Sequence, residues 1–282
     1  NCDLPVVVKA DGLALGKGVV ICRTRQEVFD ALKSVMVDLK FGENAGRKVV
    51  MEEFMTGREV TVLAFCDGKT LLPMPASQDH KKAYDGDKGA NTGGMGAFAP
   101  TPYFSEQDKN EFLQNIALPT LKGLEKEGIV FKGVLYFGLM KTSGGLKVVE
   151  YNARFGDPET QVVLALLKSD LLEIVNAVIE GRLDCTEVLW SDETALTVVV
   201  ADGGYPDNVV KGKEIRIGDL DGVRLIHAGT KLDGGRLKTN GGRVFNVVGV
   251  AESLDKARKK VYGQIDKVGF EGARYRADIG LV

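Results

Sequence analysis

Residues 149–161 read VEYNARFGDPETQ, and this stretch predicts a strand that leaves a buried core. Side chains two positions apart on a strand share a face, so Glu150, Asn152 and Arg154 are expected to point the same way. Two hard oxygen ligands suit Mg²⁺, which proteins hold through one or two carboxylates while phosphates and waters complete the shell. Arg154 could grip a phosphate through its bidentate fork. The alternative is a strand-end ion pair between Glu150 and Arg154 that has no chemical role.

Composition favours a cytoplasmic enzyme. The 282 residues, 44% of them hydrophobic, suggest about two domains. A net charge of −2 gives no electrostatic footprint for nucleic acid, and neither a membrane-spanning stretch nor a signal peptide is apparent, so we expect no nucleic-acid or membrane partner. The four cysteines, Cys2, Cys22, Cys66 and Cys185, form no CxxC pair and are interpreted as reduced thiols. The start at Asn1, directly before an apolar strand, predicts a fragment of a longer protein.

The order of elements predicts three parts. Two strands near the start flank a glycine-rich turn at 11–18, and a helix follows them. Residues 75–102 have little periodicity and are expected to form a long functional loop. Asp157 and Pro158 predict the cap and first turn of a helix. From Thr194 onward short strands and glycine turns dominate, which places a domain boundary near residue 192.

The glycine-rich turn invites a phosphate-loop interpretation, because it contains Gly16-Lys17. A Walker A loop requires glycine where Asp11 stands and serine or threonine where Gly18 stands, so that motif is rejected. A hairpin whose backbone N–H groups fold over phosphates is still possible, with Lys9 supplying charge. An ordinary glycine-rich hairpin fits the pattern equally well.

Two segments of the expected loop are candidates for binding. His80, within QDHK, could orient a substrate or could be a hydrogen-bonded structural group. The segment NTGGMGA at 91–97 has three glycines in four positions, which favours a pocket built from backbone, although a flexible tip is the alternative. His227 lies in an apolar run and is expected to be structural. With only two histidines, a three-histidine metal site is excluded, and no serine–histidine–aspartate arrangement suggests a hydrolase.

Taken together, VVKADGLALGKGV, EEFMTGREV, PMPASQDHKKAYDGDKGANTGGMGA, GVLYFGLM, VVEYNARFGDPETQ, HAGT, TNGGRV and FEGARYRADIG run through the chain in order. They resemble the ATP-grasp superfamily and, within it, the glycinamide ribonucleotide synthetases. The resemblance implies an α+β ATP-grasp fold, with two subdomains and antiparallel sheets that sandwich ATP, and then a small mixed C-terminal domain. The implied limits are 1–55 for the small subdomain, 56–192 for the large subdomain and 193–282 for the C-terminal domain.

The resemblance also assigns roles to residues. ATP binding falls on Lys9, Gly12, Gly16, Lys17, Gly18, Glu52, Glu53, Phe54, Met55 and Glu59, with Glu59 on the ribose. Mg²⁺ or Mn²⁺ falls on Glu150 and Asn152. Phosphate and catalytic contacts fall on Arg154 and Asp157. Substrate binding falls on His80, Lys81, Asn91, Thr92, Gly93, Gly94, Met95 and Gly96.

The implied reaction belongs to purine biosynthesis. ATP phosphorylates the carboxylate of glycine, and the amine of 5-phosphoribosylamine then displaces phosphate from glycyl phosphate to give the amide. No covalent enzyme nucleophile is needed, which fits a site rich in Lys, Arg and metal ligands. The family has an N-terminal domain that helps bind the sugar phosphate, and its segments do not occur before Asn1. That missing domain is therefore an expected partner.

Three other interpretations are open. A biotin-carboxylase-like ligase would share Lys9, Glu150 and Asn152 but would not need QDHK and NTGGMG. A silent nucleotide-binding module would lose its metal ligands, whereas both are present here. A purely structural protein would bind no Mg·ATP. The sequence does not determine whether the native polypeptide has one function or is a segment of a multifunctional purine enzyme.

Overall fold

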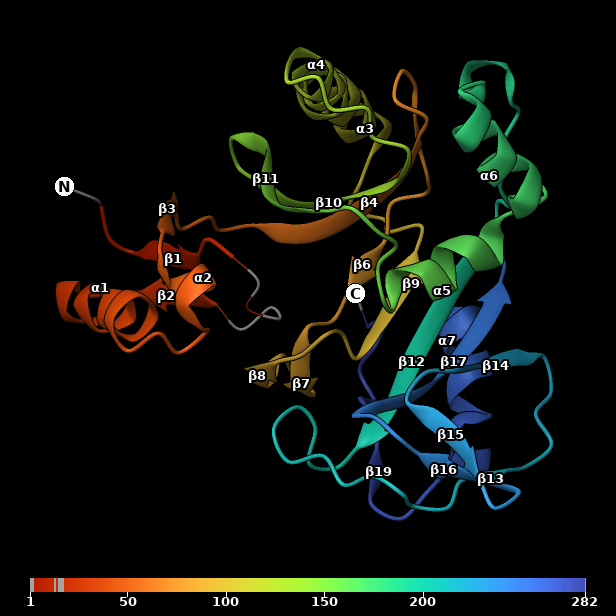
Figure 1. The fold of residues 1–282 in the computed structure, drawn as a ribbon. Coiled ribbons are helices and arrows are strands. Elements are labelled where there is room, and N and C mark those ends of the chain that lie inside the picture. The colour runs from red at the N-terminus through yellow and green to blue at the C-terminus, as the bar shows by residue number, and fades with distance from the viewer. Residues whose placement is uncertain (1–2, 13, 15–17, 282) are drawn as a thin grey trace. The chain divides into compact units, whose positions relative to one another are not determined.

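The computed structural model describes residues 3–12, 14 and 18–281. It divides into two compact units, Asn1–Gly57 and Arg58–Val282, which are described separately. All strand pairs in the described residues are antiparallel, and helices accompany them in both units (Figure 1). The fold class is therefore α+β, as the sequence predicts.

The first unit is a three-stranded sheet with helices. Its strands are β1 (Val6–Ala10), β2 (Val19–Cys22) and β3 (Val49–Glu53), in the order β2-β1-β3. Its helices are α1 (Arg25–Leu32), which continues as a π-helical turn at Lys33–Val37, and α2 (Glu43–Gly46). The hydroxyl oxygen of Thr24 accepts a hydrogen bond from the backbone N–H of Glu27 and caps α1. Valines of β1 pack against α1 to form a small core.

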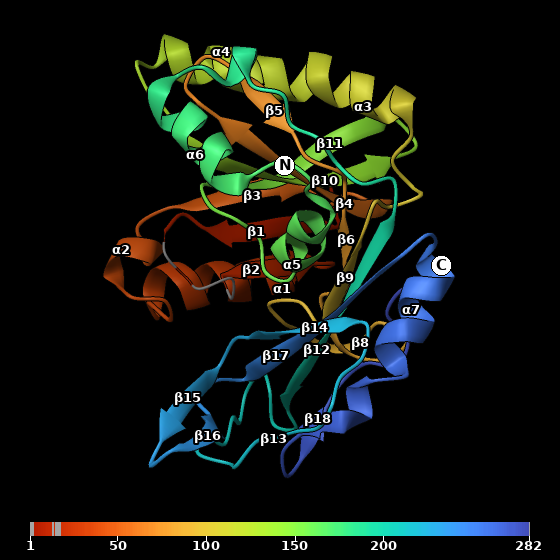
Figure 2. The ribbon, with the colours of Figure 1, turned by 90° about the vertical axis from the view of Figure 1, so that its right-hand side faces the viewer.

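The second unit contains a four-stranded sheet in the order β11-β10-β4-β5. Its strands are β4 (Arg58–Cys66), β5 (Leu71–Pro73), β10 (Gly133–Thr142) and β11 (Gly145–Asn152). The helices α3 (Glu106–Phe112) and α4 (Leu118–Lys126) lie along it, joined by a π-helical turn at Leu113–Ala117 (Figure 2). Phe112 and Ile116 pack on Val62, Phe137 and their neighbours, so one face of this sheet is a buried apolar core.

A second, six-stranded sheet contains β14-β17-β12-β9-β6, with β19 paired to β12. Its strands are β6 (Gln78–Asp79), β9 (Gly96–Ala99), β12 (Thr194–Asp202), β14 (Val223–His227), β17 (Arg243–Ala251) and β19 (Ala273–Arg274). The helix α7 (Leu254–Tyr262) packs on the face that carries Leu196 and Val198. The opposite face packs against the helix α5 (Glu159–Val163), so the sheet is buried on both sides.

The remaining elements are short. They are β7 (Lys82–Tyr84) with β8 (Lys88–Asn91), β13 (Arg216–Ile217) with β18 (Val268–Gly269), β15 (Thr230–Asp233) with β16 (Arg236–Thr239), the helix α6 (Leu171–Glu180), and 3-10 turns at Leu164–Leu166, Leu183–Cys185 and Ile265–Lys267. Gly181 ends α6 in the left-handed conformation, with φ of 73°. No helix in the described part of the chain is long and apolar enough to cross a membrane.

Two local predictions are wrong. Residues 75–102 do not form one loop, because β6, β7, β8 and β9 lie within them. These strands are short and find their partners by tertiary pairing, which periodicity does not reveal. Asp157 does not cap α5, whose flanking residue is Pro158 with no side-chain cap. The Asp157 carboxylate binds Arg243 and Gln161 instead.

One continuous sheet contains strands from both sides of the predicted boundary near residue 192. Ala195 of β12 stands opposite Ala99 of β9, so strands from both sides of that boundary share hydrogen bonds. The first unit ends at Gly57, close to the predicted limit at 55. The division into three domains stays a prediction.

Candidate functional site

In the first unit, Lys9 of β1 lies beside Glu52 of β3. Its Nζ is 2.6 Å from a carboxylate oxygen of Glu52, and the two side chains are 20% and 33% exposed. Both residues are predicted to bind ATP, and the sheet therefore brings them together. A pair that is still partly open to solvent can exchange partners when a phosphate arrives, because its desolvation is incomplete.

The glycines at the two ends of the glycine-rich turn lie where a side chain would clash. A Cβ at Gly12 would come 2.7 Å from Cα of Ala45, and one at Gly18 would come 2.7 Å from Cβ of Ala14. Gly16 and Lys17 lie outside the described residues. Of residues 52–55, which are predicted to bind ATP, Glu53 ends β3, and Phe54 and Met55 follow it as half-buried residues.

In the second unit, the face of the four-stranded sheet opposite α3 and α4 carries polar side chains. Residues directly opposite each other in a ladder share a face. Gly138 of β10 stands opposite Glu150 of β11 and Thr61 of β4, and Tyr136 stands opposite Asn152. Glu59 lies one pair further along, opposite Met140. Glu150, Asn152 and Glu59 therefore share one face, as the alternation in the sequence predicts for the first two.

Glu150 and Asn152, the two predicted metal ligands, lie on one face of β11. Glu150 is exposed and Asn152 is half-buried. Neither side chain makes a hydrogen bond or ion pair with another residue in the part of the chain that the structure describes. No group of three or more His, Cys, Asp or Glu among those residues is arranged to hold a metal. A divalent ion on this pair would need outside oxygens, which is the usual situation for Mg²⁺ with a bound phosphate.

Lys81 and Asp79 add charge to the same face. Nζ of Lys81 is 2.6 Å from a carboxylate oxygen of Glu59, and Glu150 also acts on it electrostatically. Burial would lower the pKa of Lys81, but Asp79 and Glu59 outweigh that effect and raise it. Burial raises the pKa of Asp79 to about 7, with Lys81 opposing the shift and Glu159 and Glu59 adding to it. Lys81 is therefore a fixed positive charge beside the predicted metal ligands.

A buried carboxylate, Glu159, packs against side chains of this same face. It accepts hydrogen bonds from Tyr136 Oη at 2.9 Å and from Thr61 Oγ1 at 3.4 Å. Burial raises the pKa of Glu159. A Cβ at Gly156 would come 2.6 Å from Glu159 Oε2, so the glycine of the GDPE sequence makes room for the carboxylate.

The two residues predicted to be catalytic have different surroundings. Arg154 is exposed, and its guanidinium donates a hydrogen bond to the carbonyl of Phe155 at 2.8 Å. Asp157 is held by Arg243 of β17, whose Nη2 lies 2.9 Å from Asp157 Oδ2 and whose Nη1 donates to the backbone carbonyl of Asp157 at 2.7 Å. Arg154 is free to reach a ligand, whereas Asp157 is already fixed.

Arg243 also holds the NTGG segment. Its Nη1 donates to the carbonyl of Gly93 at 2.8 Å and contacts that of Gly94 at 3.4 Å. A Cβ at Gly93 would come 2.9 Å from the guanidinium, and one at Gly94 would come 2.4 Å from Cδ of Pro158. The two glycines therefore allow close packing between this loop, Arg243 and the GDPE segment.

The other predicted substrate residues divide into surface and core. Asn91 is exposed and Thr92 half-buried, and both Thr92 N and Oγ1 donate to the carbonyl of Lys81 at 2.8 Å. Met95 is fully buried against Val199 and Ala201. Gly96 is also buried and pairs with Val198 in the sheet. Met95 and Gly96 thus belong to the core beneath the loop, while Asn91, Thr92 and Gly93 border solvent.

His80 is a packed residue at the start of the same segment. Its ring lies 5.9 Å from that of Phe98, and its Nδ1 is buried without a hydrogen-bond partner in the described chain. Burial lowers the pKa of His80, and nearby Arg276 lowers it further. The imidazole is therefore neutral at neutral pH, and its role in substrate binding stays a prediction.

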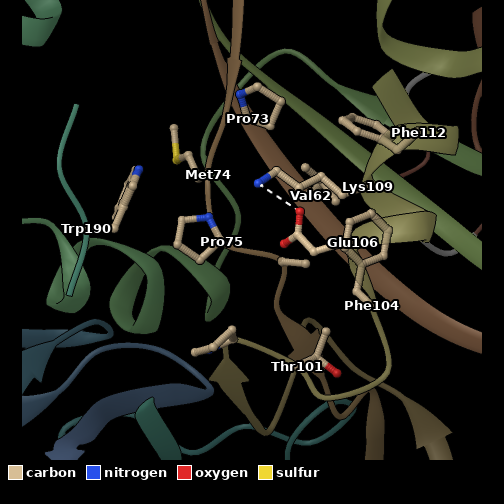
Figure 3. Close-up of a pocket in the computed structure, with 12 residues that line it drawn as sticks. Val62, Pro73, Met74, Pro75, Thr101, Phe104, Glu106, Lys109, Phe112 and Trp190 are labelled. Atoms are coloured by element: carbon tan, nitrogen blue, oxygen red, sulfur yellow. Dashed lines mark ion pairs between the residues drawn. The ribbon is translucent and has the colours of Figure 1, made fainter. Parts of the chain in front are cut away.

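A separate pocket opens between α3 and the loops around Pro75 and Pro100 (Figure 3). Met74, Trp190 and Phe104 line it, together with Glu106 and Lys109, which form an ion pair at 3.6 Å. Among the residues that the structure describes, none of those predicted to bind ATP, metal or substrate lines this pocket. This pocket is therefore separate from the predicted binding residues of the second unit.

Sequence reasoning missed four residues that organise this region: Asp79, Tyr136, Glu159 and Arg243. Asp79, Glu159 and Arg243 stand inside the segments QDHK, GDPE and TNGGRV, so the segments were informative although the residues were not singled out. Tyr136 stands inside the segment GVLYFGLM, but nothing in that segment indicates a contact with Glu159. Its contact with Glu159 depends on the approach of a strand and a helix.

Comparisons with known proteins agree with this architecture. Residues 1–160 match the family model described as "Phosphoribosylglycinamide synthetase, ATP-grasp (A) domain", and residues 195–282 match the C domain of the same synthetase. A phosphoribosylamine–glycine ligase of Brucella melitensis is 48% identical over 280 residues, which cover 98% of this chain and 65% of that protein. A bifunctional purine biosynthetic protein of Schizosaccharomyces pombe is 46% identical, with 99% of this chain and 36% of that protein covered.

Solved structures give the same relationship. The phosphoribosylamine–glycine ligase of Thermotoga maritima superimposes with a TM-score of 0.86 at 38% identity, covering 98% of this chain and 68% of that one. A biotin carboxylase domain from Hydrogenobacter thermophilus, solved with MgADP and bicarbonate, reaches a TM-score of 0.72 at 14% identity and shares the fold, covering 96% of this chain and 58% of that one. The chain spans about two thirds of the length of its bacterial relatives, 65% for the Brucella protein. With its ATP-grasp and C-terminal segments both matched, the chain belongs to the phosphoribosylglycinamide synthetase family.

Proposed function

We propose that this chain forms the ATP-grasp and C-terminal parts of a ligase that joins glycine to 5-phosphoribosylamine. The product is glycinamide ribonucleotide, with release of ADP and phosphate. The observation that carries the proposal is the open polar face of the four-stranded sheet, where Glu150 and Asn152 lie near Lys81. Family membership supports the choice of substrates, because named relatives are phosphoribosylamine–glycine ligases.

The residues fit an ATP-dependent reaction through a bound divalent ion, Mg²⁺ or Mn²⁺. Glu150 and Asn152 would hold the ion, which would neutralise the phosphate oxygens of ATP as charge develops during transfer. Lys9 would add positive charge near the phosphates of ATP, Lys81 would add positive charge beside the substrates, and Glu59 would accept hydrogen bonds from the ribose. Arg154, which is exposed and donates a hydrogen bond to a neighbouring carbonyl, would contact the transferred phosphoryl group.

The reaction then needs positioning more than covalent catalysis. A carboxylate oxygen of glycine attacks the γ-phosphorus and ADP leaves. The amine nitrogen of the sugar attacks the acyl carbon, phosphate leaves, and the amine loses its proton. Asn91, Thr92 and Gly93 border solvent, Thr92 is hydrogen-bonded to Lys81, and these residues would line the pocket for the substrates. His80, Gly94, Met95 and Gly96 support that loop from behind.

We also propose that turnover requires a further domain of the kind that makes the relatives longer, and that the protein acts in the cytoplasm. The test is ADP release with Mg·ATP and glycine, with and without freshly generated phosphoribosylamine. It compares this chain with a polypeptide that also carries the preceding part of a relative. Release that requires both substrates supports the ligase. Release that requires bicarbonate instead, or none despite ATP binding, contradicts it.

A further inference from the structure

The hairpin β7–β8 is held by a segment almost two hundred residues further along the chain, Arg274–Asp278. Arg274 Nη1 donates to the carbonyl of Ala83, and the Arg274 guanidinium lies 4.7 Å from the centre of the Tyr84 ring. The backbone N–H of Gly86 donates to Asp278 Oδ2 at 2.8 Å, and that of Ala277 donates to Asp85 Oδ1 at 2.9 Å. Each of the two segments therefore donates hydrogen bonds to the other. The contacts cover the hairpin from its base to its tip.

Arg276 is the centre of this attachment. Its side chain is 2% exposed, and it donates to both carboxylate oxygens of Asp278 at 2.7 Å. It also donates to Asp87 Oδ1 at 2.9 Å and to the carbonyl of Lys82 at 3.0 Å. Burial would raise the pKa of Asp278, but its hydrogen bonds with Arg276 outweigh that effect and lower it. A buried guanidinium tolerates desolvation only while such partners are in place, so the contact is geometrically strict.

The hairpin has the predicted substrate residues at its base. Lys82 pairs with Asn91, and Thr92 donates twice to the carbonyl of Lys81. Arg276 donates a hydrogen bond to the carbonyl of Lys82, which directly follows Lys81. A shift of this hairpin would therefore move Lys81, Asn91 and the following glycines together.

We propose that Arg276 is a positioning residue, which holds the β7–β8 hairpin so that Lys81 and Asn91–Gly93 are placed for the acceptor substrates. Its effect on catalysis rests on the proposed ligase function, whereas its effect on the hairpin does not. Within the described part of the chain, Arg276 makes no hydrogen bond or ion pair with a residue predicted to bind ATP or metal. The consequence for catalysis should fall on the substrates bound beside the hairpin and spare ATP.

The test uses Arg276→Met in the whole polypeptide that contains these residues. Hydrogen–deuterium exchange should rise at least about tenfold for amides 82–94, since their protection depends on the attachment. The KM for glycine or for phosphoribosylamine should rise at least about fivefold, while the KM for ATP changes by less than about twofold. Arg276→Lys should not restore either property, because an ammonium cannot reproduce the fork.

The matched control is Arg258→Met. Arg258 binds the same C-terminal segment, through the carbonyls of Ala277 and Ile279, but no residue of the hairpin. This variant should leave the hydrogen–deuterium exchange of amides 82–94 unchanged. It should also leave the KM values for glycine, phosphoribosylamine and ATP unchanged. Asp87→Asn provides a milder variant, since Asp87 is 71% exposed on its side chain and the Arg276–Asp278 pair survives. It keeps the test decisive if Arg276→Met does not fold, and should raise hairpin exchange by about threefold or more.

The outcomes separate the two proposals. Unchanged exchange at 82–94 in folded Arg276→Met, or in Asp87→Asn, overturns the attachment. Faster exchange with unchanged KM values for both acceptor substrates overturns the positioning role. Absence of glycine-dependent ADP release in the unmodified polypeptide contradicts the ligase function, and the exchange experiment still decides whether Arg276 holds the hairpin.

Discussion

Glu150 lies across Gly138, its partner on the neighbouring strand. A Cβ added at position 138 would come 2.9 Å from Cγ of Glu150. Real Cβ atoms do not approach carbon so closely, so alanine at position 138 would force the Glu150 side chain to shift. The conformation of a predicted metal ligand is therefore set by a residue on another strand.

Gly138→Ala is expected to displace Glu150 and weaken Mg·ATP binding by about tenfold or more, which corresponds to about 1.4 kcal/mol. The crowding should also lower the free energy of unfolding by about 1–3 kcal/mol. Calorimetric titration and urea unfolding measure the two effects. The control is Gly123→Ala, where a Cβ meets nothing within 4 Å in α4 and should stabilise by about 0.5–1 kcal/mol. Equal binding by both variants would contradict the steric argument.

Glu150→Ala should weaken Mg·ATP binding and lower turnover strongly, by about tenfold or more, because one of the two proposed protein ligands is lost. The fold should be preserved, since the side chain of Glu150 is exposed and makes no hydrogen bond within the described residues. Lys259→Ala is the comparison, because Lys259 makes only an exposed helical pair with Asp255. Magnesium titration at fixed ATP measures the change, and an unaffected Glu150→Ala variant would remove the metal assignment.

Arg243→Ala should lower the free energy of unfolding by about 2–4 kcal/mol, because the carbonyls of Gly93 and Asp157 lose their donor and the Asp157 carboxylate loses its charged partner. Arg243→Lys should recover only part of this lost stability, since one ammonium cannot bind two carbonyls and a carboxylate at the same time. Arg236→Ala, which breaks an exposed pair with Glu214, should cost under about 1 kcal/mol. Chemical unfolding compares the three, and similar losses at 243 and 236 would show that Arg243 holds nothing essential.

The pH dependence of stability should report on Asp79. Its folded pKa is raised to about 7, above the usual value near 4. Between these values the folded protein binds more protons than the unfolded chain, so this group lowers stability as pH rises from about 4 to about 7. Asp79→Asn removes the effect. The variant should gain about 1–3 kcal/mol over the unmodified protein at pH 8, and most of this gain should disappear by pH 4.5.

Unfolding curves at the two pH values measure this difference, with Asp255→Asn as the control for an exposed carboxylate on α7. A gain that is the same at pH 4.5 and pH 8 would mean that Asp79 is charged throughout. Its burial would then be compensated by Lys81.

Local patterns explain how much of the site was predictable. The alternation of Glu150 and Asn152 depends only on the two-residue period of a strand, and the structure places them on one face. The capping of α1 by Thr24 is equally local. The strands within residues 75–102 were missed, because two- to four-residue strands have too few residues for periodicity and depend on partners elsewhere.

The sequence by itself determined the strand that carries the two predicted metal ligands, the α+β class and the family resemblance, because these depend on neighbouring residues and on ordered motifs. Only the tertiary structure decided that Arg243 holds Asp157, 86 residues away, and that Arg276 holds Asp87, 189 residues away. Both arginines are largely buried and satisfied by groups from distant segments. A buried guanidinium needs acceptor groups close to it. These groups come from distant segments, so they meet the arginine only when the whole sheet has formed.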